Sequence, residues 1–263
     1  ALAANIHMKE EHVLLGFDTT SIYLERFAHF ANLIPGLILA GEAYINGQAS
    51  FQFRPFKISS VSARCEFMNT EIAYNHFKLK TLPNTQKEKH PFKIEINGKG
   101  GKEWKISGTA RNCKFRVNGM DIGSKPPIFS VSGNGEEDFA NYSVIVPDMT
   151  VNSTFGTLKI PSISLKGYAR LRHSMKKDRE FATFELKAPN TELSTAWANV
   201  NMPVASLIGK LWKGEAPVLS VDSVFKFQDT GITVSKRKTK IHGISGVIPL
   251  RWPFKDTGKK GKY

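Results

Sequence analysis

The chain has 263 residues, of which 41% are apolar and 23% charged, and its formal net charge is +14. This length allows one large domain or two smaller ones, and the composition argues against a wholly disordered chain. No stretch approaches the roughly 20 consecutive apolar residues that a membrane-spanning helix needs. The positive charge favours an anionic partner, but basic residues are spread along the chain, so a solvated sheet face is the simpler interpretation.

Residues 1–35 are predicted to form an N-terminal segment with one helix. Over residues 18–34, Tyr23 and Phe27 belong to a set of apolar residues at helical spacing. Pro35 cannot continue a helix, so the predicted helix ends before it.

Residues 36–189 are predicted to form a repetitive antiparallel β domain. Apolar and polar residues alternate, as they do around Phe92, Ile94 and Ile96. Turn signals separate roughly a dozen such runs at intervals of about 10 residues; they include Asn46-Gly47, Asn97-Gly98, Asn118-Gly119 and Gly133-Asn134-Gly135. We therefore predict a mainly β protein, an extended and curved antiparallel sheet that is groove-like or sandwich-like, with one or two short amphipathic helices.

Residues 190–214 interrupt this alternation and are predicted to be helical. Leu193, Trp197 and Val200 fit helical spacing, and Pro203 suits the first turn of a second segment. An amphipathic helix with Trp and Lys can lie on a membrane surface, although such a helix more often packs over the end of a sheet. The candidates for membrane contact are Trp197, Leu207 and Trp212.

Strands of the same domain are predicted to resume over residues 215–254. Val224–Phe227 alternates, Asp229-Thr230-Gly231 is a turn signal, and Ile241–Trp252 is the last candidate strand. Residues 255–263 are rich in lysine and are expected to form a loose basic tail.

The sequence holds no motif that points to catalysis or to a metal site. Its seven histidines lack HxH and HExxH spacing, and neither a G-x-S-x-G elbow nor a phosphate-binding loop occurs. The acidic run Glu136–Asp138 lacks the spaced ligands of a calcium loop. Cys65 and Cys113 fall on apolar strand positions, which favours buried free thiols and leaves one disulfide open. We therefore expect no enzyme activity, metal or cofactor.

Four glycine units recur inside strand-like runs, at Leu39–Ala43, Ile106–Ala110, Val131–Gly135 and Leu165–Ala169. Glycine inside a strand marks a bulge or bend, so these units are predicted to curve the sheet. An apolar sheet face must be covered by a second sheet, closed into a barrel, or left as a groove suited to acyl chains. The candidate groove residues are Phe51, Phe53, Phe67, Ile94, Ile96, Phe115, Val117, Val144, Val146, Leu158 and Ile160. Ordinary sandwich core is the alternative interpretation of each.

The chain resembles the AsmA-like family of Gram-negative envelope proteins, and in particular its YdbH-like branch. The resemblance covers about residues 36–186 and is carried by Gly41, Gly108, Gly133 and Gly167 and by strand pairs such as Phe56–Ile58 with Val61–Cys65. It implies a long curved sheet whose apolar groove moves phospholipid between the inner and outer membranes, and it implies no catalytic residues. Members usually carry an N-terminal membrane anchor. Ala1–Ala4 do not read as a signal peptide, so we expect a periplasmic piece whose anchor has been removed.

The leading hypothesis is a non-enzymatic protein of the periplasm or cell envelope that binds or conducts phospholipid or another acyl-chain lipid. An anionic membrane surface is a further expected partner. The alternative is a β-sandwich adhesion or polyanion-binding module that uses its basic face, and an enzyme ranks third. Nucleic acid is not expected, because the aromatic residues mostly occupy the apolar positions of the strands.

Overall fold

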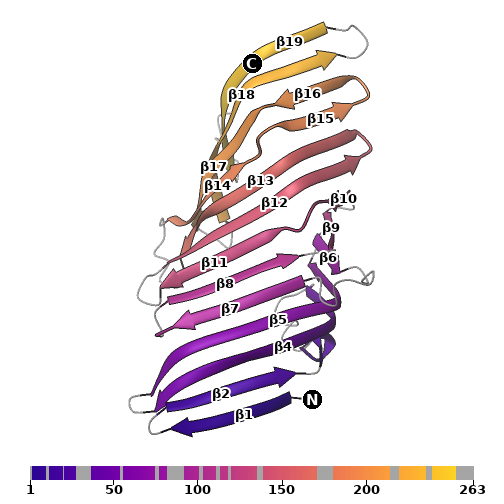
Figure 1. Cartoon of the computed structure of the whole chain (residues 1–263). Helices are drawn as coiled ribbons and strands as arrows, with labels where there is room; N and C mark the ends of the chain where they lie inside the picture. The colour runs from indigo at the N-terminus through magenta and orange to yellow at the C-terminus, as the bar shows by residue number, and fades with distance from the viewer. Residues whose placement is uncertain are drawn as a thin grey trace, which may run out of the picture.

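The computed structural model forms one antiparallel sheet of 19 strands, which confirms the mainly β class. It describes residues 2–9, 12–19, 21–27, 37–53, 56–74, 77–81, 92–100, 103–110, 113–117, 120–134, 139–170, 180–213, 219–234 and 239–252. The chain crosses the sheet from one end to the other, so β1 and β19 lie at opposite ends (Figure 1).

The strands range in length from 2 residues in β3 to 19 in β5. Their bounds are β1 (Leu2–Lys9), β2 (His12–Thr19), β3 (Ile22–Tyr23), β4 (Leu37–Phe53), β5 (Phe56–Tyr74), β6 (Phe77–Thr81), β7 (Phe92–Lys99), β8 (Glu103–Ala110), β9 (Cys113–Val117), β10 (Met120–Gly123), β11 (Ile128–Asn134), β12 (Phe139–Ser153), β13 (Gly156–Arg170), β14 (Glu180–Lys187), β15 (Thr191–Thr195), β16 (Ala198–Met202), β17 (Val204–Lys213), β18 (Leu219–Val234) and β19 (Thr239–Trp252).

The sheet has two sections that share six of its longest strands. The long section places thirteen strands side by side, in the order β1, β2, β4, β5, β7, β8, β11, β12, β13, β14, β17, β18 and β19. It therefore extends about 58 Å across the strands. The short section runs in the order β4, β5, β6, β9, β10, β12, β13, β15, β16, β18 and β19. In Figure 1, β6 and β9 are seen nearly edge-on beside β7 and β8.

A line of left-handed residues, which we call the bend, separates the two sections. Backbone φ is positive at Asn69 (51°), Asp148 (46°), Asn190 (53°) and Asp229 (51°). Asn and Asp adopt this conformation at lower cost than most other non-glycine residues. Gly41, with φ of 109°, lies at the same line in β4. Of the four predicted bending glycines, Gly41 is thus the one that sits at the bend.

The bend keeps the apolar residues of both sections on one side of the sheet. Between β4 and β5 the register shifts, because β5 has one residue more than β4 between two successive pairs. Leu39 and Ala43 have the same parity in β4, and their partners in β5 are Ile72 and Phe67. The extra residue shifts the alternation of β5, so these partners also face one side.

The helix predicted over residues 18–34 is wrong where the structure describes these residues. Asp18 and Thr19 end strand β2, and Leu24–Phe27 forms a single 3₁₀ turn. Thr19 does not cap a helix; its Oγ1 accepts a hydrogen bond from the backbone N–H of Ile45 at 2.7 Å. Residues 28–36 lie outside the described residues.

The helical segment predicted over residues 190–214 is also wrong, since β15, β16 and β17 occupy it. Leu193 and Val200 are cross-strand partners in a hairpin. A short hairpin therefore brought two apolar residues to a spacing that also suits a helix. Strand β17 also fits a helical pattern in the sequence, because it carries apolar residues on both faces, such as Leu207 and Ile208.

Three of the predicted turns lie inside strands. Asn46-Gly47 is in the middle of β4, Asn97-Gly98 is within β7, and Asp229-Thr230-Gly231 belongs to β18 at the bend. Asn118-Gly119 lies outside the described residues. Gly133 and Asn134 end β11, as a turn signal at that place predicts.

Candidate functional site

The apolar face of the long section is continuous across all of its strands. Ile96 pairs with Ala63 on one side and with Ile106 on the other. Cross-strand partners point to the same side of a sheet, so the successive register partners of these residues all lie on one face. Its members include Val13, Leu15, Phe17, Ile45, Val61, Phe67, Ile94, Ile96, Ile106, Val131, Val144, Val146, Ile163, Leu165, Leu186, Leu207, Phe225 and Ile248.

An apolar ladder crosses every strand of the short section. Each member is the register partner of the next, in the order Leu39, Ile72, Leu79, Phe115, Ile122, Val151, Leu158, Leu193, Val200, Ile232 and Ile241. The ladder therefore runs across the strands, parallel to the bend.

Small side chains fill the corner where the two apolar faces meet at the bend. Thr70 and Thr81 are 0% and 1% exposed, and the N–H of Thr70 donates to Oγ1 of Thr81 at 2.7 Å. Buried residues flank the bend from both sections, namely Ala43, Leu79, Phe92, Ala110, Ile160, Ala188, Thr191, Ala205 and Thr230. The most buried part of the apolar side is therefore this corner, where small side chains allow the two sections to approach each other closely.

Aromatic side chains reach over glycines on the neighbouring strand of the long section. A Cβ added at Gly133 would lie 2.6 Å from the Trp104 ring, and one at Gly108 would lie 2.5 Å from the Phe129 ring. Each glycine is the direct register partner of its aromatic residue. The ring of Phe17 lies over Gly47, that of Phe184 over Gly209 and that of Phe227 over Gly246, whereas at Gly167 the near group of Tyr142 is its hydroxyl. Gly108, Gly133 and Gly167 thus make room for aromatic side chains in regular strands, where the sequence predicts that they bend the sheet.

No described layer covers the apolar face. The described residues outside the strands include one helical element, the 3₁₀ turn Leu24–Phe27, which contacts β3 and β4. Apart from Leu79, Phe92 and Ile160, every buried apolar residue in the described ranges is alanine. A covered core would bury its larger apolar side chains completely. The chain exposes 18293 Å², whereas a compact protein of its mass would expose about 11,500 Å².

Charged side chains on the opposite, polar face are arranged in ion pairs. Glu185 lies 2.9 Å from Lys187 and 3.0 Å from Lys166, and these two ammonium groups lower the pKa of its carboxyl group. Lys210, at 2.7 Å, and the Tyr168 hydroxyl lower the pKa of Glu180. Pairs of this kind are exposed, so they organise the polar face and add little stability.

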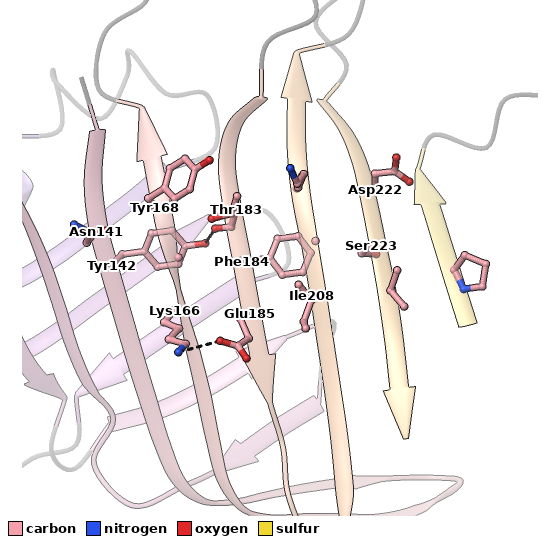
Figure 2. A pocket seen from close by; sticks show the side chains of 15 residues that line it. Asn141, Tyr142, Lys166, Tyr168, Thr183, Phe184, Glu185, Ile208, Asp222 and Ser223 are labelled. Atoms are coloured by element: carbon pink, nitrogen blue, oxygen red, sulfur yellow. Dashed lines mark hydrogen bonds and ion pairs between the residues drawn. The ribbon is translucent and has the colours of Figure 1, made fainter. Parts of the chain in front are cut away.

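A hollow of about 820 Å³ crosses β12, β13, β14, β17, β18 and β19, and its lining includes this ion pair of Lys166 with Glu185 (Figure 2). Tyr142 reaches over Gly167 and donates from its hydroxyl to the carbonyl oxygen of Thr183 at 2.7 Å. Lys166 and Glu185 pair within the lining, whereas Lys210 pairs with Glu180 and Asp222 with Arg251 outside it.

Neither cysteine forms a disulfide, and both are half-buried. Burial raises the pKa of Cys113 to about 11, and burial also raises the pKa of Cys65. A neutral, partly buried thiol behaves as a small apolar side chain, which suits the positions of both residues on the apolar side.

The structure brings most of the predicted groove residues to one side of the sheet. Phe51, Phe67, Ile94, Ile96, Val144 and Val146 lie on the apolar face of the long section. Phe115, Val117, Leu158 and Ile160 lie on the apolar side of the short section. The backbone of Phe53 belongs to β4, and its side chain lies outside the described part of the chain.

The three predicted membrane-contact residues do not share one face. Leu207 lies on the apolar face of β17, and Trp212 has the opposite parity in the same strand. Trp197 lies at a hairpin tip between β15 and β16 and is 65% exposed. Sequence reasoning missed Phe155, the most exposed of the large apolar side chains described, at 85%. It also missed the seats that Gly47, Gly209 and Gly246 provide for aromatic rings.

In the described ranges, no group of three or more His, Cys, Asp or Glu side chains is placed to hold a metal ion. In the same part of the chain, no helix is long and apolar enough to cross a membrane. No family model, curated protein or solved structure matches this chain.

Proposed function

We propose that the apolar side of the bent sheet is a groove that binds the acyl chains of phospholipid or another lipid. The observation that carries this proposal is an apolar face that continues through the thirteen strands of the long section without a covering layer among the described residues. Most members of this face are half-buried and Ile248 is 46% exposed, so the face keeps apolar surface that an apolar partner can cover.

An acyl chain fits the groove because the apolar residues of successive strands form a track across the sheet. Tyr142 and Ser223 also lie on this side, but their hydroxyls donate to the carbonyl oxygens of Thr183 and Leu250. Burying a methylene group on one side contributes about 0.4 kcal/mol, half the value for complete burial, or on the order of 6 kcal/mol for a palmitoyl chain. Because the track repeats at every strand, a bound chain can shift by one strand and find an equivalent surface. This repetition favours conduction along the sheet over a single fixed site.

The proposal extends to a place in the cell. A groove about 58 Å long runs across the strands, so an acyl chain that enters it at one strand can leave it many strands away. Together with the resemblance to the AsmA-like family, this length favours a protein of the periplasm or cell envelope that conducts phospholipid between membranes.

The alternative, a polyanion-binding module that uses the basic face, is supported by the net charge of +14. The polar face carries cations, but Glu185 and Glu180 pair with three of them, and Asp222 pairs with Arg251 at 3.1 Å. A binding site for a polyanion needs cations that are free to contact it.

Mass spectrometry of organic extracts of the purified protein tests the proposal. We expect phospholipid or fatty acid to be extracted in amounts comparable to the amount of protein. Reproducibly lipid-free protein that binds heparin, with an affinity that falls as salt is added, would refute the groove and favour the polyanion module.

A further inference from the structure

Two neighbouring hairpins of the short section end in the same kind of turn. Between β12 and β13, the Ser153 hydroxyl accepts from the N–H of Phe155 at 3.3 Å and donates to the carbonyl oxygen of Gly156 at 3.1 Å. Between β15 and β16, the Thr195 hydroxyl accepts from the N–H of Trp197 at 3.4 Å and donates to the carbonyl oxygen of Ala198 at 2.8 Å. Both turns have the pattern hydroxyl residue, any residue, aromatic residue, small residue.

Each turn holds its aromatic side chain out into solvent. Phe155 is 85% and Trp197 65% exposed, which makes them the two most exposed aromatic residues of the described chain. Gly156 is the register partner of Thr195, so the two tips stand on adjacent hairpins. The separation of neighbouring strands places them about 5–10 Å apart.

We propose that these two tips form a docking site for the interfacial region of a lipid bilayer. Aromatic residues, Trp above all, concentrate at the level of the lipid headgroups, where an amphipathic ring contacts both apolar and polar groups. The turns fix the backbone beneath both rings, so insertion costs little conformational entropy. The net charge of +14 favours approach to anionic lipid.

The size of the site favours a bilayer over a protein partner. Two aromatic side chains offer about 400 Å² in total, at roughly 200 Å² each. A stable protein interface buries about 800 Å² on each partner and requires a matching surface. A bilayer requires no matching surface, and two projecting rings can enter it without a flat contact around them.

This inference deepens the proposed function and rests on it for its purpose, because docking would bring the groove to a membrane that supplies or receives lipid. The two sites are nevertheless separate. The rings stand at hairpin tips, beyond the strand ends of the short section, whereas the groove follows the apolar residues of the strands. Vesicle binding and uptake of single lipid molecules can therefore be measured independently.

Co-sedimentation with vesicles of phosphatidylcholine and phosphatidylglycerol in equal parts tests the docking site. We expect Phe155→Ser and Trp197→Ser each to weaken partitioning about tenfold, and the double variant about a hundredfold. Val247→Ser is the matched control, because Val247 is 63% exposed on the polar face of β19, away from the two tips. It should bind vesicles like the unchanged protein.

Uptake of a monomeric fluorescent fatty acid, measured on the same variants, separates docking from the groove. We expect the double variant to take up this probe normally and to keep its β circular dichroism spectrum. The docking site would be overturned if the unchanged protein did not bind vesicles, or if the double variant bound them as well as the control does. Vesicle binding through both rings without fatty-acid uptake would support the docking site and refute the groove.

Discussion

Two adjacent residues of β12 provide a direct comparison of the two faces of the sheet. Val144 lies on the apolar face between its partners Phe129 and Leu165, and Ile145 points to the polar face, where it is 40% exposed. Val144→Glu and Ile145→Glu introduce the same carboxylate one residue apart. We expect both variants to fold and only Val144→Glu to lose acyl-chain binding.

The expected cost in stability follows from the half-burial of Val144. Losing the burial that its neighbours provide costs about 1 kcal/mol, and the new carboxylate reaches water because no described layer covers it. A filled sandwich core would instead leave an unpaired buried charge, which costs about 3–5 kcal/mol. The affinity for an acyl chain should fall at least about tenfold, because the chain would have to lie against a hydrated carboxylate.

Urea denaturation and fatty-acid titration measure the two effects. The account predicts a loss of about 1 kcal/mol in unfolding free energy for each variant, with binding lost only in Val144→Glu. The reasoning would be refuted if Val144→Glu failed to fold while Ile145→Glu stayed stable, because that result would require a covered core.

Three further predictions concern the rings, the bend and the thiols. Gly133→Val should displace the Trp104 ring, change the tryptophan fluorescence and lower the free energy of unfolding by about 1–3 kcal/mol. Gly98→Ala is the control, because its added Cβ would lie 3.6 Å from the carbonyl oxygen of Glu103, in ordinary contact; equal losses in the two variants would contradict the close approach of the ring to Gly133. Asn190→Val should lower the free energy of unfolding, measured by thermal unfolding, by about 1–2 kcal/mol, because valine adopts a left-handed backbone conformation only at a cost. Asn190→Gly should be nearly neutral, because glycine adopts that conformation freely. Equal stability of the two variants would argue against the bend. Alkylation of Cys113, followed in a variant without the other cysteine, should keep accelerating up to about pH 11, because burial holds the thiol protonated until then; a rate that levels off near pH 8.5, about the pKa of an exposed thiol, would contradict this burial.

The strands and the apolar side could be predicted because they depend on local alternation. Ile94 and Ile96, or Val144 and Val146, stand two residues apart and must share a face in any strand. Their neighbours across the sheet follow from the order of the strands, which a meander keeps close to the order of the sequence. Most candidate groove residues can therefore be identified without knowledge of the register.

The bend and the hairpins of the short section could not be predicted by the same reasoning. Asn69 and Asp229 resemble ordinary turn residues in the sequence, because the left-handed conformation serves both a turn and a bulge. Leu193 and Val200 fit a helix and a tight hairpin equally well. Phe155 and Trp197 occupy the same place in two similar four-residue segments, Ser153–Gly156 and Thr195–Ala198. A comparison of these two segments of the sequence could have identified both residues.

Photo-cross-linking to phospholipid tests the central claim most directly, since it reports which face of the sheet touches lipid. A photoreactive amino acid would replace Ile94 on the apolar face in one protein and Lys93 on the polar face in another, one residue apart in β7. The account predicts that the group at Ile94 forms a covalent adduct with the acyl chain and that the group at Lys93 does not. Equal labelling at both positions, or labelling at Lys93 alone, would contradict it.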